Sequence, residues 1–276
     1  MNTPLPMFDR AALAARRRRA DPDELFLHRL AMQDVQDRLA AVNREFTKPA
    51  IVTPFPDVWR RGLDADLADA ACVADSDVLD LAPDSHDLVI HAMGLHWAND
   101  PVGQLIQCRR ALREDGLLLA VALGGGTLSE LRAVLMRAES EVTGGLSPRV
   151  SPMAEIRDLG GLLQRAGLAL PVADTFDVTA DYRDLTHLMH DLRAMGEANA
   201  LAQRLRHPTR RAVFARAAEL YHAEHGRADG RIPARFEFIC LTGWAPAESQ
   251  PRPLRPGSAR VRLADALQTQ ETPLPD

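Results

Sequence analysis

The sequence predicts an α/β fold built on a mostly parallel sheet. Short apolar runs at residues 50–53, 71–74 and 87–93 alternate with segments that have helical periodicity. Residues 117–123, LLLAVAL, form an unbroken apolar run, which is typical of a strand buried on both faces. Strands that alternate with helices in this way favour a parallel sheet with helices on both faces.

The composition is that of an ordinary folded domain. The chain has 276 residues, of which 46% are hydrophobic and 26% charged, and its formal net charge is -5. This balance does not favour nucleic acid as a partner, and the length fits one large domain or two small ones. No apolar run approaches the roughly 20 residues that a membrane-spanning helix requires, so we expect no membrane span.

Cysteine and histidine spacing gives no sign of a metal site. The cysteines Cys72, Cys108 and Cys240 are far apart in the sequence and have no metal-binding or redox spacing. His187 and His190 share a helix face, but no third ligand accompanies them. We therefore predict reduced thiols, no bound metal and a cytoplasmic location.

Residues 1–48 predict an N-terminal helical extension. Within it, residues 22–46 repeat apolar side chains every three or four positions, which predicts one long amphipathic helix. We interpret Arg16–Arg19 as the solvated basic end of a helix, because no apolar segment follows to make a secretory signal. A mitochondrial-type presequence is the alternative, although the acidic residues DPDE follow at once.

Residues 49–245 predict the main α/β domain. Its further helices are expected at residues 57–70, 101–113, 127–142, 183–195 and 208–225, and another is expected to open at Ser151–Pro152. Later strands are expected at residues 168–178 and 236–244. Residues 246–276 are rich in proline and predict a largely disordered tail.

The carboxyl ends of the predicted parallel strands are where a ligand is expected. Thr53–Phe55, Asp75–Asp77 and Ala92–Gly94 follow three of these strands. Asp75 is suited to accept hydrogen bonds from a ribose hydroxyl or an adenine amine, and the alternative is a solvated loop aspartate.

The loop GLHWANDP, residues 94–101, gathers polar and aromatic side chains after a strand. His96, Trp97 and Asn99 are candidates for a site on this loop. The alternative is that Trp97 seals the top of the sheet, while Asn99 or Asp100 caps the next helix. The glycines at 124–126 offer a further strand-to-helix turn, where free N–H groups hold an anion or bare backbone allows close packing.

Several longer segments resemble a known family. They are MFDRAAL at residues 7–13, DSHDLVIHAMGLHWANDP at 84–101, residues 109–132, residues 144–167, LMHDLRAMGEANAL at 188–201, FEFICLTGW at 236–244 and residues 254–267. Together they resemble class I S-adenosylmethionine (SAM)-dependent methyltransferases, and specifically a subfamily found in alphaproteobacteria and mitochondria. The resemblance implies a Rossmann-like methyltransferase sheet, SAM as cofactor and a protein client. The subfamily's mitochondrial member is an assembly factor of respiratory complex I, described as an arginine hydroxylase.

The resemblance also assigns positions in the cofactor site. Asp75 and Ser76 match the family's acidic motif on the adenine side, and Met93–Trp97 match the loop after its fourth strand. The ribose ligand has no secure counterpart, and Asp64 or Asp66 is only a nominal candidate.

The turn after the first strand departs from the family. Members carry a glycine-rich loop there, of the DLGCGxG kind, because the cofactor lies against bare backbone. This chain has IVTPFPDVW instead, in which Pro54 and Pro56 remove two N–H donors. Between Ala50 and Asp75 there is room for about one βαβ unit, so we predict that one strand and one helix of the usual seven-stranded sheet are missing.

Two functions follow as hypotheses. The first is a SAM-dependent methyltransferase-like enzyme, or an arginine hydroxylase, that acts on a complex I subunit during assembly. Its catalytic candidates are His96, Trp97 and Asn99, and its cofactor-binding candidates are Thr53, Phe55, Asp75, Ser76, Met93 and Gly94. The second is a catalytically inactive pseudoenzyme of the same fold that serves as a binding protein or assembly chaperone, which the altered turn favours.

Overall fold

The computed structural model describes residues 5–64, 67, 69–251 and 261–269. Contacts divide the chain into two units, Met1–Pro246 and Ala247–Asp276. The first unit contains the sheet, and the described part of the second contains the short helix α9, Leu263–Leu267. Residues 252–260 and 270–276 of the predicted tail lie outside the described residues.

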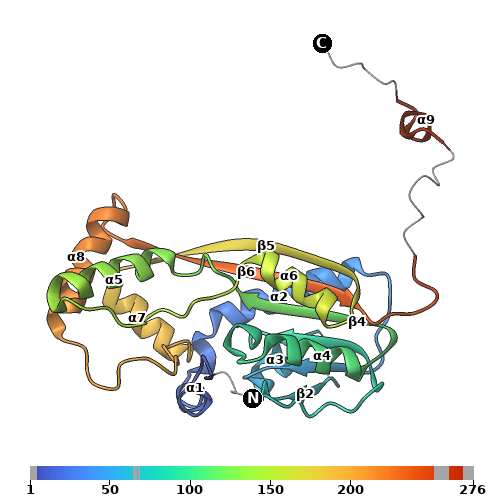
Figure 1. The fold of residues 1–276 in the computed structure, drawn as a ribbon, viewed down its shortest axis with the longest axis horizontal. Coiled ribbons are helices and arrows are strands. Elements are labelled where there is room, and N and C mark those ends of the chain that lie inside the picture. Colours follow the sequence, from blue (N-terminus) through green and yellow to red (C-terminus); the bar gives the residue numbers. More distant parts are fainter. Residues whose placement is uncertain (1–4, 65–66, 68, 252–260, 270–276) are drawn as a thin grey trace. The chain divides into compact units, whose positions relative to one another are not determined.

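In the described part of the first unit, six strands form one sheet in the order β2-β1-β3-β4-β6-β5 (Figure 1). Neighbouring strands among β1 to β4 are parallel, β6 runs antiparallel to β4, and β5 runs antiparallel to β6. The strands are β1 Pro49–Val52, β2 Ala71–Val73, β3 His86–Ala92, β4 Leu112–Leu123, β5 Ala169–Tyr182 and β6 Ile232–Trp244. The predicted α/β class, with a sheet one strand short of seven, is confirmed.

The connection from β1 to β2 shows where the sheet is shortened. It contains α3, Pro56–Gly62, and β2 then pairs directly with β1 through Ile51 and Cys72. The predicted helix at 57–70 was too long, because α3 ends at Gly62 and the chain leaves helical geometry at Leu63. Because β2 pairs directly with β1, Asp75, which lies just beyond β2, is next to the turn after β1.

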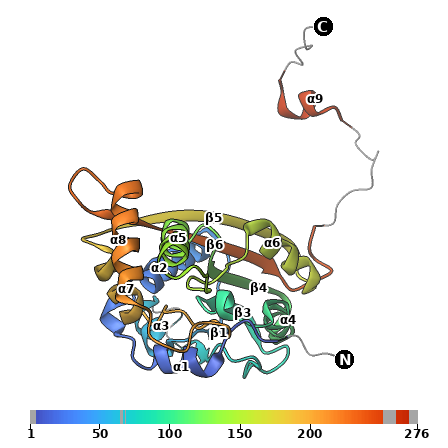
Figure 2. The same cartoon turned by 60° about the vertical axis from the view of Figure 1, so that its left-hand side comes forward.

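Alternate residues of the central strands face two hydrophobic cores. Ile51, Ile90 and Leu119 belong to one core, whereas Val52, Val89 and Leu118 belong to the other. The first core is covered by α2 (Phe26–Ala41), α3, α5 (Ser129–Thr143), α7 (Leu185–Ala194) and α8 (Arg211–His225). The second is covered by α4 (Pro101–Ala111) and α6 (Ile156–Arg165), so helices lie on both faces of the sheet (Figure 2).

Two other predicted helix boundaries were wrong. The helix expected over 22–46 is a short 3₁₀ helix at Pro22–Glu24 followed by α2, which ends at Ala41 because Val42 is already extended. Ser151–Pro152 opens no helix, and α6 begins only at Ile156. The intervening segment is instead tied to the glycine turn, since the Gly125 N–H donates to the Ala154 carbonyl at 3.1 Å. No helix within the described residues is long and apolar enough to cross a bilayer.

Candidate functional site

The N-terminal helix α1, Arg10–Arg17, lies against the loops that follow β2 and β3. Its entry is fixed by Asn99, whose Oδ1 accepts the Phe8 N–H at 2.8 Å while its Nδ2 donates to the Phe8 carbonyl at 3.2 Å. The Phe8 and Trp97 rings meet edge to face, with centroids 5.1 Å apart. Asn99 and Trp97, predicted as catalytic, thus both contact the N-terminal segment. The helix cap after this loop is Asp100, which accepts the Gly103 N–H.

Asp75 is at the centre of the contact with α1. Arg17 Nη1 donates to both carboxylate oxygens of Asp75, at 2.8 and 2.9 Å. Arg10 donates to the Asp75 backbone carbonyl and to the Trp97 carbonyl, the latter at 3.3 Å. The Asp75 side chain is 6% exposed and that of Arg17 is 8% exposed. The interpretations of Asp75 as a solvated loop residue and of Arg17 as a solvated helix end were therefore wrong.

The backbone beside Asp75 is closely packed. A Cβ placed on Gly94 would lie 2.8 Å from the Asp75 Cβ and 2.9 Å from its Oδ2. Met93, the residue before it, is fully buried and has a φ of 57°, a left-handed conformation that is strained for a side chain of this size. Glycine at 94 is what allows the β3 loop to approach the carboxylate so closely.

Replacing Gly94 by alanine is expected to destabilise the protein by about 1–3 kcal/mol, because the added methyl group overlaps an aspartate that Arg17 holds in place. Urea unfolding followed by circular dichroism measures the change. The matched control is Gly161→Ala within α6, where a Cβ meets nothing within 4 Å, and this variant should be neutral or more stable. Equal stability of the two variants would contradict the close packing at Gly94.

The turn after β1 is filled by its own side chains. Thr53 is buried, and its Oγ1 accepts the Phe55 N–H at 3.2 Å. Phe55 packs edge to face on His28, with centroids 4.9 Å apart. Ser76 is exposed, and its carbonyl accepts a hydrogen bond from Gln104. Of the nominal ribose ligands, Asp64 is exposed and Asp66 lies outside the described residues.

A second carboxylate, Glu197, joins the loop after β3 to the segment after α7. Its Oε2 accepts the Trp97 indole N–H at 2.7 Å and lies 3.4 Å from His96 Nε2. Burial acts to raise the pKa of Glu197, but the hydrogen bond from His96 and the nearby charges of His96 and Arg17 lower it to about 2. Glu197 is therefore ionised although its side chain is only 5% exposed. Sequence reasoning did not identify it.

His28 of α2 completes this buried polar group. Its Nδ1 accepts the Trp59 indole N–H at 2.9 Å, so the neutral ring bears its proton on Nε2. Burial lowers the pKa of His28 to about 3. His28 Nε2, Arg17 Nε and Nη2, and Glu197 Oε1 have no hydrogen-bond partner among the described residues, and all four atoms are shielded from solvent.

The residues around Asp75 do not fit SAM in this arrangement. An adenine amine or ribose hydroxyl would have to displace Arg17 from the carboxylate. The turn at 53–56 presents Phe55 and two prolines where bare backbone is needed.

The glycine turn at 124–126 already holds a carboxylate of the chain. The Gly126 N–H donates to Glu237 Oε2 at 2.8 Å. A Cβ on Gly124 would lie 2.4 Å from the same oxygen. The turn therefore combines both functions expected from the sequence, close packing and a carboxylate on a free N–H, but the carboxylate comes from β6.

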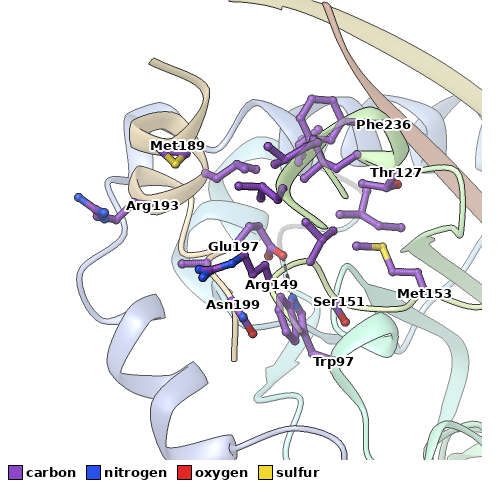
Figure 3. Close-up of a pocket in the computed structure, with 18 of the residues that line it drawn as sticks. Trp97, Thr127, Arg149, Ser151, Met153, Met189, Arg193, Glu197, Asn199 and Phe236 are labelled. Carbon is purple, nitrogen blue, oxygen red and sulfur yellow. Dashed lines mark hydrogen bonds between the residues drawn. The ribbon is translucent and has the colours of Figure 1, made fainter. Parts of the chain in front are cut away.

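A cavity of about 230 Å³ opens beside Glu197, between the glycine turn, α5, α7 and α8 (Figure 3). Trp97 and Phe236 lie on opposite sides of it, and Glu197 lies between them (Figure 3). Arg149 also lines it, but that guanidinium is paired with Glu139 at 2.6 Å. The remaining wall is mainly aliphatic, including Leu27, Leu123, Leu128, Leu131, Leu135, Met153 and Met189. Such a cavity suits an apolar group or the stem of a longer side chain.

Residues 53–120, which include all the predicted site residues, match a family model described as "Methyltransferase domain". The match covers about a quarter of the chain, and the sheet order agrees with the Rossmann-like methyltransferase fold expected from the sequence.

The chain is similar to two groups of proteins. It is 39% identical over 197 residues to "Arginine-hydroxylase NDUFAF5, mitochondrial" of Danio rerio, covering 71% of this chain and 61% of the relative. It is 36% identical over 190 residues to "Malonyl-[acyl-carrier protein] O-methyltransferase" of Laribacter hongkongensis, covering 69% and 61%. The chain thus spans about three fifths of the length of these relatives.

Among solved structures, the chain is similar to a putative methyltransferase from Bacillus halodurans. The TM-score is 0.47 and the sequence identity 14%, over 78% of this chain and 98% of that one.

Proposed function

We propose that the chain is a methyltransferase-fold binding protein that serves in the assembly of respiratory complex I, with its own helix α1 in the place of a cofactor. The ion pair between Arg17 and Asp75 supports the loss of the cofactor, because it engages the carboxylate that the family uses on the adenine side. The client, a complex I subunit, rests on the family resemblance, and the cytoplasmic location rests on the widely spaced cysteines expected to be reduced.

The cavity beside Glu197 is the proposed client site. Its aliphatic wall and the Trp97 ring suit a side chain inserted from a partner protein. Because Trp97 is fixed by Glu197 and Phe8, the cavity wall is rigid before the client arrives. In this proposal the buried polar group positions the wall of a binding site and performs no chemistry.

The second candidate is a SAM-dependent enzyme, which the enzyme names of both groups of relatives favour. It requires α1 to move so that Arg17 releases Asp75. The cofactor would then contact Thr53, Phe55, Asp75, Ser76, Met93 and Gly94. His96, Trp97 and Asn99 would face the acceptor.

Calorimetric titration with SAM separates the two candidates. For the binding protein we expect no heat of binding and no thermal shift at millimolar SAM, because the ligand must break a buried ion pair. Binding at micromolar SAM would contradict the proposal and establish the second candidate.

The client site is tested in cells of the source organism that lack the gene. Ala198 lines the cavity, so Ala198→Trp should block it and leave complex I assembly as low as in the deletion strain. Ala228→Trp, at an exposed position in the loop after α8, is the matched control and should restore assembly fully. Normal complex I in the deletion strain itself would refute the assembly function.

A further inference from the structure

Strand β5 forms a long edge of the sheet. Among the described strands it pairs with β6 alone, and it lies along the upper margin of the sheet in both views (Figures 1 and 2). Proteins usually protect such an edge with proline, lysine, a bulge or a very short strand. Pro171 and the irregular register between Ala169 and Val172 protect the start of β5. Residues 173–181 contain no proline, glycine or lysine, so the rest of the edge lacks these protections.

The direction of the backbone groups shows which residues of β5 form the free edge. The Gly124 N–H, at the end of β4, donates to the Glu237 carbonyl of β6 at 2.8 Å, so odd-numbered residues of β6 point toward β4. Even-numbered residues of β6 therefore point toward β5. Because Phe238 pairs with Phe176, even-numbered residues of β5 point back toward β6. The N–H and carbonyl groups left at the edge belong to Ala173, Thr175, Asp177, Thr179 and Asp181.

These five outward residues are available to another strand. Within the described part of the chain, their N–H and carbonyl groups make no hydrogen bond to another segment. All of them except Ala173 are exposed, so no helix of the first unit blocks the approach of a second chain. A continuous row of unpaired backbone groups at a sheet edge favours the addition of a strand.

The aspartates of β5 do not make this edge repulsive. Each is paired with an arginine of the same chain, at 2.5 Å for Asp174 and Arg38, 2.8 Å for Asp177 and Arg235, and 2.5 Å for Asp181 and Arg227. Because the carboxylates of the strand are balanced in this way, it does not select a strongly acidic or basic peptide. An identical strand can approach it without repulsion between like charges.

We propose that two copies of the chain associate through this edge, with β5 of one copy antiparallel to β5 of the other. A two-fold axis at Phe176 places Thr175 opposite Asp177 of the partner subunit and Ala173 opposite Thr179 of the partner subunit. This register engages four of the five outward residues and sets no aspartate opposite another, whereas an axis at Asp177 would oppose that residue to itself. A second copy is favoured over an unrelated strand because the two-fold axis repeats every one of these pairs.

Sedimentation equilibrium of the full chain tests the proposal. At micromolar concentration the wild type should have twice the chain mass of 30.3 kDa. Thr175→Pro removes an outward N–H from each copy and leaves the hydrogen bonds to β6 in place, so it should weaken the association by about tenfold or more. Thr175→Val keeps the N–H and is the matched control, which should associate like the wild type.

A cysteine at the axis gives a second measurement that does not depend on the proline variant folding. Phe176→Cys should form a disulfide-linked dimer under mild oxidation, because residues that face each other across such an axis have Cα atoms about 4.5 Å apart. Val178→Cys would lie about 13 Å from its copy and should not crosslink. The wild type, with its three native cysteines, is the blank.

A wild type that stays monomeric up to its solubility limit would overturn the proposal. A dimer that persists in Thr175→Pro and gives no crosslink through Phe176→Cys would also overturn it, because the two copies would then meet through another surface. If Thr175→Pro does not fold by circular dichroism, the contrast between the two cysteine variants decides.

Discussion

Replacing Asp75 by alanine is expected to lower the free energy of unfolding by about 3–5 kcal/mol. The variant leaves the Arg17 guanidinium buried without the carboxylate that receives two hydrogen bonds from it, and removal of one partner of a buried ion pair has this effect. Urea unfolding at pH 7, followed by tryptophan fluorescence and by circular dichroism, measures the difference.

A double variant separates the ion pair from simple packing. Arg17→Met with Asp75→Leu removes both charges and fills similar volume, so it should recover most of the stability lost in Asp75→Ala. Asp77→Ala is the control at an exposed neighbour whose side chain is 65% exposed, and it should change stability by less than about 0.5 kcal/mol. If Asp75→Ala also lowered the free energy of unfolding by less than about 0.5 kcal/mol, α1 would not be held by Asp75. The main support for the binding-protein proposal would then be lost.

Much of the fold was predictable because short stretches of the sequence, taken by themselves, indicate their secondary structure. The apolar run at 117–123 needed no knowledge of its neighbours to be recognised as a buried strand, and it forms the centre of β4. The short interval between Ala50 and Asp75, compared with the seven-stranded sheet that the family resemblance implies, predicted a missing strand–helix unit, and β2 pairs directly with β1. The Ser151–Pro152 error has a different origin, because a contact with Gly125, distant in the sequence, outweighs the local helix signal.

The site was less predictable because its contacts join distant parts of the chain. Arg17 stands in a run of four arginines, and nothing local distinguishes the one that reaches Asp75, 58 residues away. Glu197 lies within LMHDLRAMGEANAL, a segment that contributed to the family resemblance without any chemistry attached to it. Its pairing with Trp97 spans 100 residues. The sequence therefore identified the residues near the sheet edge, but only the structure showed which residues they pair with.

Acid is expected to weaken the fold through His28. The pKa of its buried ring is lowered from 6.5 in the unfolded chain to about 3 in the fold, so the unfolded state binds the proton first as the pH falls. The neutral ring makes its full contribution to the free energy of unfolding above pH 6.5. This contribution is lost between pH 6.5 and about 3, at about 1.4 kcal/mol per pH unit. Glu197, with a pKa lowered from 4.5 to about 2, adds its own loss only below pH 4.5. Between pH 6.5 and 4.5 the loss comes from buried histidines, since burial also lowers the pKa of His91. The share of His28 is expected to be about 3 kcal/mol, and a variant of His28 separates it from that of His91.

His28→Gln tests this expectation, because glutamine keeps an acceptor for the Trp59 indole N–H but does not titrate. Glu197, Arg17 and His96 face His28 and remain in the variant, so the comparison removes only the buried imidazole. The free energy of unfolding in urea should fall about 3 kcal/mol less between pH 6.5 and 4.5 in His28→Gln than in the wild type. His190→Gln, at an exposed position on α7, should retain the wild-type slope. Parallel curves for wild type and His28→Gln would mean that the ring is solvated or already charged in the fold, and the packed polar group that closes the cofactor site would then be open to water.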